Sequence, residues 1–317
     1  MRKDARRNNA SVTRGDLQGY HGARQAGINY AFCGFRSNKY FTSDRTIKCN
    51  EHFQREDGKP MKGYGLEIET GFALARSDVA RNILANIMQT AVFPTFPDDL
   101  FKMQEDGSIS GVECITQVMT KEFIRNHYKD FKTMYNDLFP MFGIRCDDGS
   151  CGMHVNISNG LLGTTPKTQE ASLRKLYYII NKHYDFFKAA FYRTGSTTYC
   201  GRMSCENAKT MDVNAMPSSH YNSFNGSHFR EGRIEIRLVG GQKNFACFRN
   251  TMEVVFHIVD AVKDLSWADC DDLTKIFKGC NKYVFDRIKS RCYDAGSISL
   301  QAVEAIKATV NFETEYL

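Results

Sequence analysis

Four short segments in which charged and apolar side chains alternate constrain the fold of this chain more than any other feature. They are 64–70 (YGLEIET), 108–118 (SISGVECITQV), 152–158 (GMHVNIS) and 232–238 (GRIEIRL). Successive side chains of a β-strand point to opposite faces, so each segment, read as a strand, has one apolar and one polar face. The alternation therefore predicts strands that cover a core with one face only.

The polar face of these strands has an unusual composition, with acids, arginines and an imidazole but no lysine. Its members are Glu67, Glu69, Glu113, His154, Asn156, Arg233, Glu235 and Arg237. Two interpretations stay open. An antiparallel sheet with a solvated face shows the same alternation. Alternatively, the sheet is the floor of a site in which the acids lie together.

A floor of this kind would need positive charge. Glu105, from the turn EDGS (105–108), would bring the number of carboxylates to five. Like charges a few ångströms apart repel by several kcal/mol, on the order of the Coulomb energy at intermediate dielectric. Arg230, Arg233 and Arg237 would offset part of this charge. Divalent cations would supply the rest, and oxygen ligands with one histidine, His154, favour Mg²⁺ or Mn²⁺.

The remaining patterns predict an α+β fold. Apolar residues at helical spacing indicate helices over 121–139, 167–192 and 244–264, with a mostly helical tail, and 141–158 is typical of a hairpin. Strands joined by hairpins or by single long helices favour a curved, mainly antiparallel sheet with long helices packed on one face.

Positive charge is concentrated at the N-terminus. Residues 1–63 carry 13 Lys and Arg against 6 Asp and Glu, whereas the remaining residues carry 29 against 30. We therefore expect a basic extension over 1–60, partly disordered or a small accessory region, and a separate domain over 61–317 with a helical C-terminal tail. Nucleic-acid binding is expected, if at all, only through the basic arm. Cys49 and His52, with Cys33 more distant, offer half of a zinc site or are simply buried side chains.

The same composition indicates a soluble cytoplasmic protein. No apolar run approaches the roughly 18 residues that span a bilayer, so no membrane partner is expected. The 11 cysteines are an odd number without a regular framework, which fits a reducing compartment.

Five blocks of the chain, in order, resemble the amidoligase family, relatives of glutamine synthetase and γ-glutamylcysteine ligase. They are YGLEIET (64–70), EDGSISGVECIT (105–116), CGMHVNIS (151–158), HYNSFN (220–225) and GRIEIRLVGG (232–241). The resemblance implies the glutamine synthetase-like catalytic fold and an ATP-dependent carboxylate–amine ligase that forms an amide or isopeptide bond through an acyl phosphate. Family members often occur in bacterial viruses, which would place the protein in the host cytoplasm.

The resemblance also assigns roles to residues. Two or three Mg²⁺ ions would bind to Glu67, Glu69, Glu105, Glu113, His154 and Glu235. Arg237 would contact the γ-phosphate or the acyl phosphate, beside Glu235 and Arg233, and Arg193 and Arg230 would contact the nucleotide. The other substrates would be a carboxylate and an amine, free or carried by a peptide or protein. Two alternatives stay open: a binding or structural protein that retains the fold, and a metal-dependent phosphotransferase.

Overall fold

The computed structural model describes residues 62–313, apart from gaps at 73–82, 85–86, 97–99, 106–108, 110, 148, 150, 196, 214–215, 217–218 and 220. The basic extension and its cysteines therefore lie outside the described residues, and the boundary near residue 60 stays a prediction. The described part divides into two compact units. One contains the residues up to Met153 with Gly241–Phe245, and the other contains His154–Gly240 with Ala246–Leu317.

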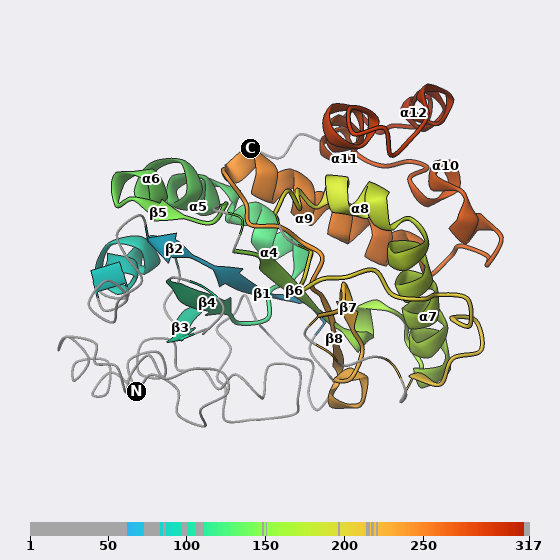
Figure 1. Cartoon of the computed structure of the whole chain (residues 1–317), viewed down its shortest axis with the longest axis horizontal. Helices are drawn as coiled ribbons and strands as arrows, with labels where there is room; N and C mark the ends of the chain where they lie inside the picture. The colour runs from blue at the N-terminus through green and yellow to red at the C-terminus, as the bar shows by residue number, and fades with distance from the viewer. Residues whose placement is uncertain are drawn as a thin grey trace. The chain divides into compact units, whose positions relative to one another are not determined.

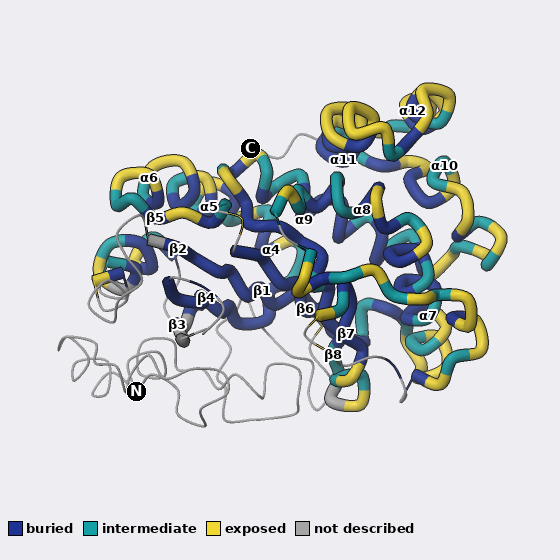
Figure 2. The backbone as a smooth tube through the Cα atoms, viewed as in Figure 1, coloured by how far each residue is buried: buried dark blue, intermediate teal, exposed yellow. Residues whose placement is uncertain are grey.

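Three antiparallel strands in the order β3-β4-β1 form the sheet of the first unit. They are β1 (Tyr64–Glu69), β3 (Phe101–Glu105) and β4 (Val112–Thr116). Both β1 and β4 are buried along their whole length, as the dark blue tube in Figure 2 shows. The alternating pattern thus predicted the strands correctly, and both faces of β1 and β4 are covered.

Short helical segments complete the first unit. In chain order they are η3 (Met88–Val92), η4 (Phe93–Thr95), α4 (Lys121–Asn126), α5 (Tyr128–Thr133), η5 (Met134–Leu138) and α6 (Phe139–Met141). The Thr120 side chain caps α4 by accepting a hydrogen bond from the backbone N–H of Phe123. The helix expected over 121–139 is thus a series of segments. Pro140 does not end it, because Pro140 lies in the first turn of α6, where no intrahelical N–H is needed.

The hairpin expected over 141–158 is wrong. Strand β5 (Ile144–Arg145) pairs with β2 (Gly71–Phe72), and β6 (Met153–Ser158) pairs with β8. Alternation shows which face of a strand is apolar but not which strand lies beside it, and β5 is only two residues long.

The second unit has its own antiparallel strands, in the order β6-β8-β7. Strand β8 (Arg233–Ile236) lies between β6, which enters this unit at His154, and β7 (Phe224–Asn225). The register pairs Asn156 with Glu235 on one side and Asn225 with Glu235 on the other. Glu235 is therefore the middle residue of a row of three polar side chains.

Helices make up most of the second unit, and Figure 1 shows their course. They are α7 (Pro166–Lys182), α8 (Tyr184–Ala190), α9 (Phe245–Ala261), α10 (Leu273–Ile276), α11 (Lys282–Arg287), η10 (Ile288–Tyr293) and α12 (Leu300–Lys307), with short 3-10 turns η6 (Asn159–Leu161), η8 (Phe229–Glu231) and η9 (Asp269–Asp271). The helix expected over 167–192 is broken at His183, whose ring Nε2 lies 3.0 Å from the carbonyl oxygen of Cys270.

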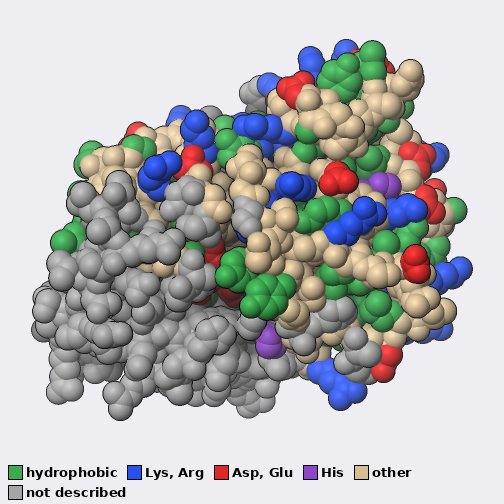
Figure 3. Space-filling model, in the orientation of Figure 1, with side chains coloured by type: hydrophobic (Ala, Val, Ile, Leu, Met, Phe, Trp, Pro, Cys, Tyr) green, Lys and Arg blue, Asp and Glu red, His purple; other side chains and the backbone are tan. Residues whose placement is uncertain are grey.

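The combination of antiparallel strands and helices confirms the α+β class. Among the described residues, no helix has both the length and the apolar character that a bilayer crossing requires. On the face drawn in Figure 3, basic and acidic side chains are interspersed over the second unit.

Candidate active site

Three carboxylates share one face of the first unit's sheet. Glu69 of β1 lies directly opposite Glu113 of β4, and an oxygen of each carboxylate lies within 4.8 Å of an oxygen of the other. Glu67 is two residues before Glu69 and therefore on the same face. Only 7% of Glu67, 6% of Glu69 and 2% of Glu113 is exposed. These acids do not form a solvated face, so that alternative is wrong for this part of the sheet.

The backbone around the acids is tightly packed. The N–H of Gly152 donates a hydrogen bond to the Glu69 carboxylate, which fixes the orientation of that side chain. The Thr70 hydroxyl donates to the carbonyl of Val112 over 2.6 Å. At Gly111, a Cβ atom would lie 1.9 Å from the carbonyl oxygen of Thr70, so no other residue fits there without a backbone shift.

Glu105 has a different position from the one that the sequence suggested. It is the last residue of β3 rather than part of a turn, and its register partner is Val112. The residue paired with Glu113 is Gln104. The backbone register thus aligns Glu105 with Val112 and not with Glu113. Its role as a metal ligand stays a prediction.

Glu235 is the centre of a buried polar cluster in the second unit. Its carboxylate accepts hydrogen bonds from Arg237 Nη1 over 2.5 Å and from Asn225 Nδ2 over 3.1 Å, and the Nδ1 atom of His154 lies 3.3 Å away. His154 Nδ1 is also 3.5 Å from Arg237 Nη1. The side chains of Glu235, His154 and Arg237 are 3%, 8% and 11% exposed. A buried ion pair between Arg and Glu holds both groups in a fixed geometry.

The two other arginines near β8, Arg233 and Arg230, differ in their exposure and contacts. Arg233 Nη1 donates to the Asn156 side-chain oxygen over 2.7 Å, next to Glu235 in the register. Arg230 lies outside the strand, in η8, and is exposed. The structure thus brings Arg233 to the polar row and leaves Arg230 at its edge.

Arg193 and Arg237 of the second unit both act on the thiol of Cys200. Arg193 follows α8, and its Nη1 atom donates to the carbonyl of Val239 over 3.4 Å. Burial raises the pKa of the Cys200 thiol, and the nearby charges of Arg193 and Arg237, with a hydrogen bond from Arg193, act in the opposite direction. The charges of both arginines therefore act on one thiol, and the roles of Arg193 and Arg237 in nucleotide binding stay predictions.

Sequence reasoning did not find the hydrogen bond of Asn225 to Glu235 or the effect of two arginine charges on the thiol of Cys200. Asn225 could have been found, because it ends a short polar segment and the pairing of β7 with β8 places it beside Glu235. Cys200 lies in a loop, where no periodic pattern predicts contacts.

The donor sets suit a hard divalent cation. In the first unit the available ligands are carboxylate oxygens, which Mg²⁺ and Mn²⁺ prefer. Facing carboxylates repel one another unless a proton or a cation is shared between them, and a divalent ion supplies that charge. In the second unit, Glu235 and His154 add one oxygen and one nitrogen donor.

The chain was compared with known proteins. No protein-family model matches it. No curated protein matches it at a significant level either. The likeness to amidoligases therefore depends on the five motif blocks and on the residues described above.

Proposed function

We propose that this chain is an ATP- and Mg²⁺-dependent carboxylate–amine ligase with the glutamine synthetase-like catalytic fold. The observation that carries the proposal is the buried cluster in which Glu235 holds Arg237 beside His154. A guanidinium fixed by a carboxylate is a common way to stabilise charge during phosphoryl transfer. The facing acids Glu69 and Glu113 provide independent support, because they suit a divalent cation.

In the proposed reaction, an oxygen of the substrate carboxylate attacks the γ-phosphorus of ATP, and ADP leaves. An amine then attacks the acyl phosphate, loses a proton and displaces inorganic phosphate, which leaves an amide. Bound Mg²⁺ would neutralise phosphate charge during the first step. Its protein ligands would be Glu67, Glu69 and Glu113, with Glu235, His154 and Glu105 as further candidates.

Arg237 has the main part in this scheme. One N–H of its guanidinium is directed at Glu235, and the planar group carries five N–H donors in a geometry that suits phosphate oxygens. Glu235 keeps the group in place, and Asn225 orients Glu235 from the other side. Arg193, which acts on the same thiol as Arg237, would contact the nucleotide, with Arg230 nearer the solvent.

The test is a screen of carboxylates, each with and without amines, for release of ADP, followed by intact-mass analysis of the products. The proposal requires ADP release that depends on both an acid and an amine, with a product that has lost one water relative to them. ADP release with a phosphorylated acid and no need for an amine would instead establish the phosphotransferase. Failure to bind nucleotide would establish the binding or structural protein.

A variant pair links the result to the cluster. Glu235→Gln keeps the shape of the side chain but removes the charge that holds Arg237, and we expect the rate to fall by about 10²–10³-fold, as for other lost electrostatic contacts. Glu206→Gln removes the same charge from an exposed position and should change the rate by less than about twofold. Equal rates in the two variants would refute the assignment of Glu235.

A further inference from the structure

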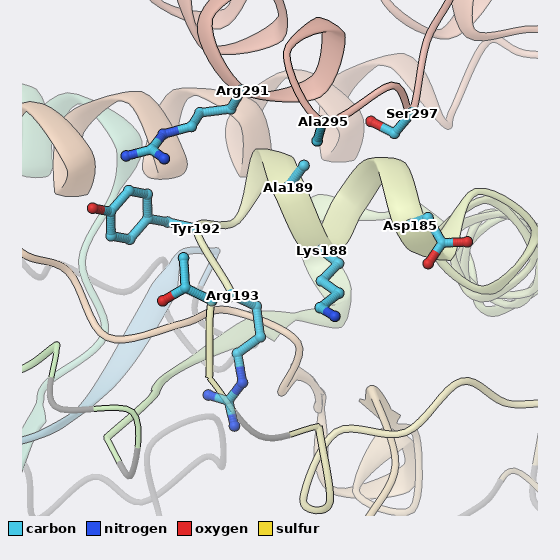
Figure 4. A pocket seen from close by; sticks show the side chains of 9 residues that line it. Asp185, Lys188, Ala189, Tyr192, Arg193, Arg291, Ala295 and Ser297 are labelled. Carbon is cyan, nitrogen blue, oxygen red and sulfur yellow. The ribbon is translucent and has the colours of Figure 1, made fainter.

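The second unit contains a pocket in which cationic side chains predominate (Figure 4). Its volume is about 380 Å³, within the range of roughly 300–1,000 Å³ of small-molecule sites. The lining comes from α8, the turn after it, η10 and the loop that follows η10. The lining residues are Asp185, Lys188, Ala189, Tyr192, Arg193, Thr194, Arg291, Ala295 and Ser297.

Three positive charges line this pocket against one negative charge. Lys188 and Arg193 point the same way from α8 and the turn after it, whereas the guanidinium of Arg291 turns toward Tyr192 (Figure 4). The carbon atom at the centre of that guanidinium lies 4.3 Å from the centre of the Tyr192 ring. Stacking of this kind holds an arginine in place while it leaves its N–H donors available at the edge.

The wall that carries Tyr192 is rigid. Tyr192 has a φ of 59°, a left-handed conformation that is costly for an aromatic residue. The backbone there is confined, because a Cβ atom at Gly240 would lie 2.4 Å from the Tyr192 carbonyl oxygen. The N–H of Gly240 donates to the carbonyl of Phe191, and Arg193 donates to that of Val239. These contacts fix the turn between Lys188 and Arg193.

We propose that this pocket binds a small molecule with two negative charges, a phosphomonoester or a dicarboxylate. The excess of positive charge in the lining matches such a ligand, and the hydroxyl of Ser297 adds a polar group at the opposite wall. Lys188 and Arg291 would hold the two anionic groups, and Arg193, which the proposed function assigns to the nucleotide, would link this pocket to the candidate active site. Because Arg193 also hydrogen-bonds the thiol of Cys200 beside Arg237, a bound anion would act on the arginines of the candidate active site.

The experiment is isothermal titration calorimetry of the full chain at constant ionic strength, with inorganic phosphate in one series and succinate in the other. We expect saturable binding of one anion per chain in at least one series. The series that saturates tells which chemistry, phosphate or dicarboxylate, the pocket prefers. The measurement reads binding and not turnover, so its outcome is independent of the proposed ligase activity.

Two variants and a control identify the site. Lys188→Gln and Arg291→Gln should each weaken binding at least tenfold, and neither side chain is buried, so both variants should fold. Lys289→Gln removes a charge from an exposed position of the same helical segment as Arg291, outside the pocket, and should change affinity less than twofold. Binding of neither anion, or equal losses in all three variants, would overturn the proposal.

Discussion

If Glu69 and Glu113 are metal ligands, they should destabilise the protein when no metal is bound. Their carboxylate oxygens lie within 4.8 Å of each other in a buried position. Two full charges at that separation repel by about 3 kcal/mol at an effective dielectric constant of about 20. A proton shared between them would lower this value, so we expect a net cost of about 1–3 kcal/mol.

Glu113→Gln removes the repulsion with little change in shape. In EDTA the variant should therefore be more stable than the wild type by about 1–3 kcal/mol, or about 2–10 °C in Tm for a protein of this size. With Mg²⁺ at about one hundred times its Kd, the wild type should gain about 2.7 kcal/mol from binding, whereas the variant should gain much less. The stability advantage of the variant should therefore shrink or reverse on addition of metal.

The assay is thermal unfolding followed by circular dichroism, in EDTA and in a series of Mg²⁺ and Mn²⁺ concentrations. Asp137→Asn, at an exposed position of the same unit, is the matched control and should leave both the Tm and its metal dependence unchanged. The reasoning is refuted if Glu113→Gln lowers the Tm in EDTA and leaves the metal-dependent rise intact.

Three further predictions concern packing, pH and thiol chemistry. Gly111→Ala should destabilise the first unit by about 1–3 kcal/mol in urea unfolding, because its Cβ has no space, whereas Gly201→Ala, with 3.3 Å to the nearest atom, should cost clearly less. Burial lowers the pKa of His183 in the folded protein. As the pH falls, the imidazole is therefore protonated in the unfolded chain before it is protonated in the folded protein, and the free energy of unfolding should decrease below about pH 6.5. That slope should become shallower in His183→Gln, measured as unfolding free energy against pH. Burial raises the pKa of Cys280 and Cys292 to about 12, so iodoacetamide at pH 8 should modify the half-buried Cys205 and Cys247 before these two buried thiols. Modification of Cys292 in the native protein, seen by mass spectrometry, would contradict the structure.

The strands and the polar row could be predicted because both follow from a period of two. Alternation placed Glu67 and Glu69 on one face of β1, and Glu235 and Arg237 on one side of the β8 segment, and the contacts in each unit agree. Burial of the acids could not be read from the pattern, because a solvated face would alternate in the same way.

Features that depend on pairing or on loops could not be predicted. The partner of β5 is set by tertiary contacts, and the break at His183 interrupts a continuous apolar pattern because the imidazole contacts Cys270, 87 residues away. The position of Cys200 near two arginines comes from a loop without periodicity. Motif order could suggest which residues matter, but the hydrogen bonds of Asn225 and Arg233 required the register of β6, β7 and β8.

Because the backbone of Tyr192 is left-handed, substitution at this position should affect stability and anion binding in opposite directions. Glycine there would relieve the unfavourable φ, which favours the folded backbone at this position. The same change would delete the ring on which Arg291 rests. Selection for thermal stability should therefore favour glycine at position 192, whereas selection for anion affinity should favour tyrosine.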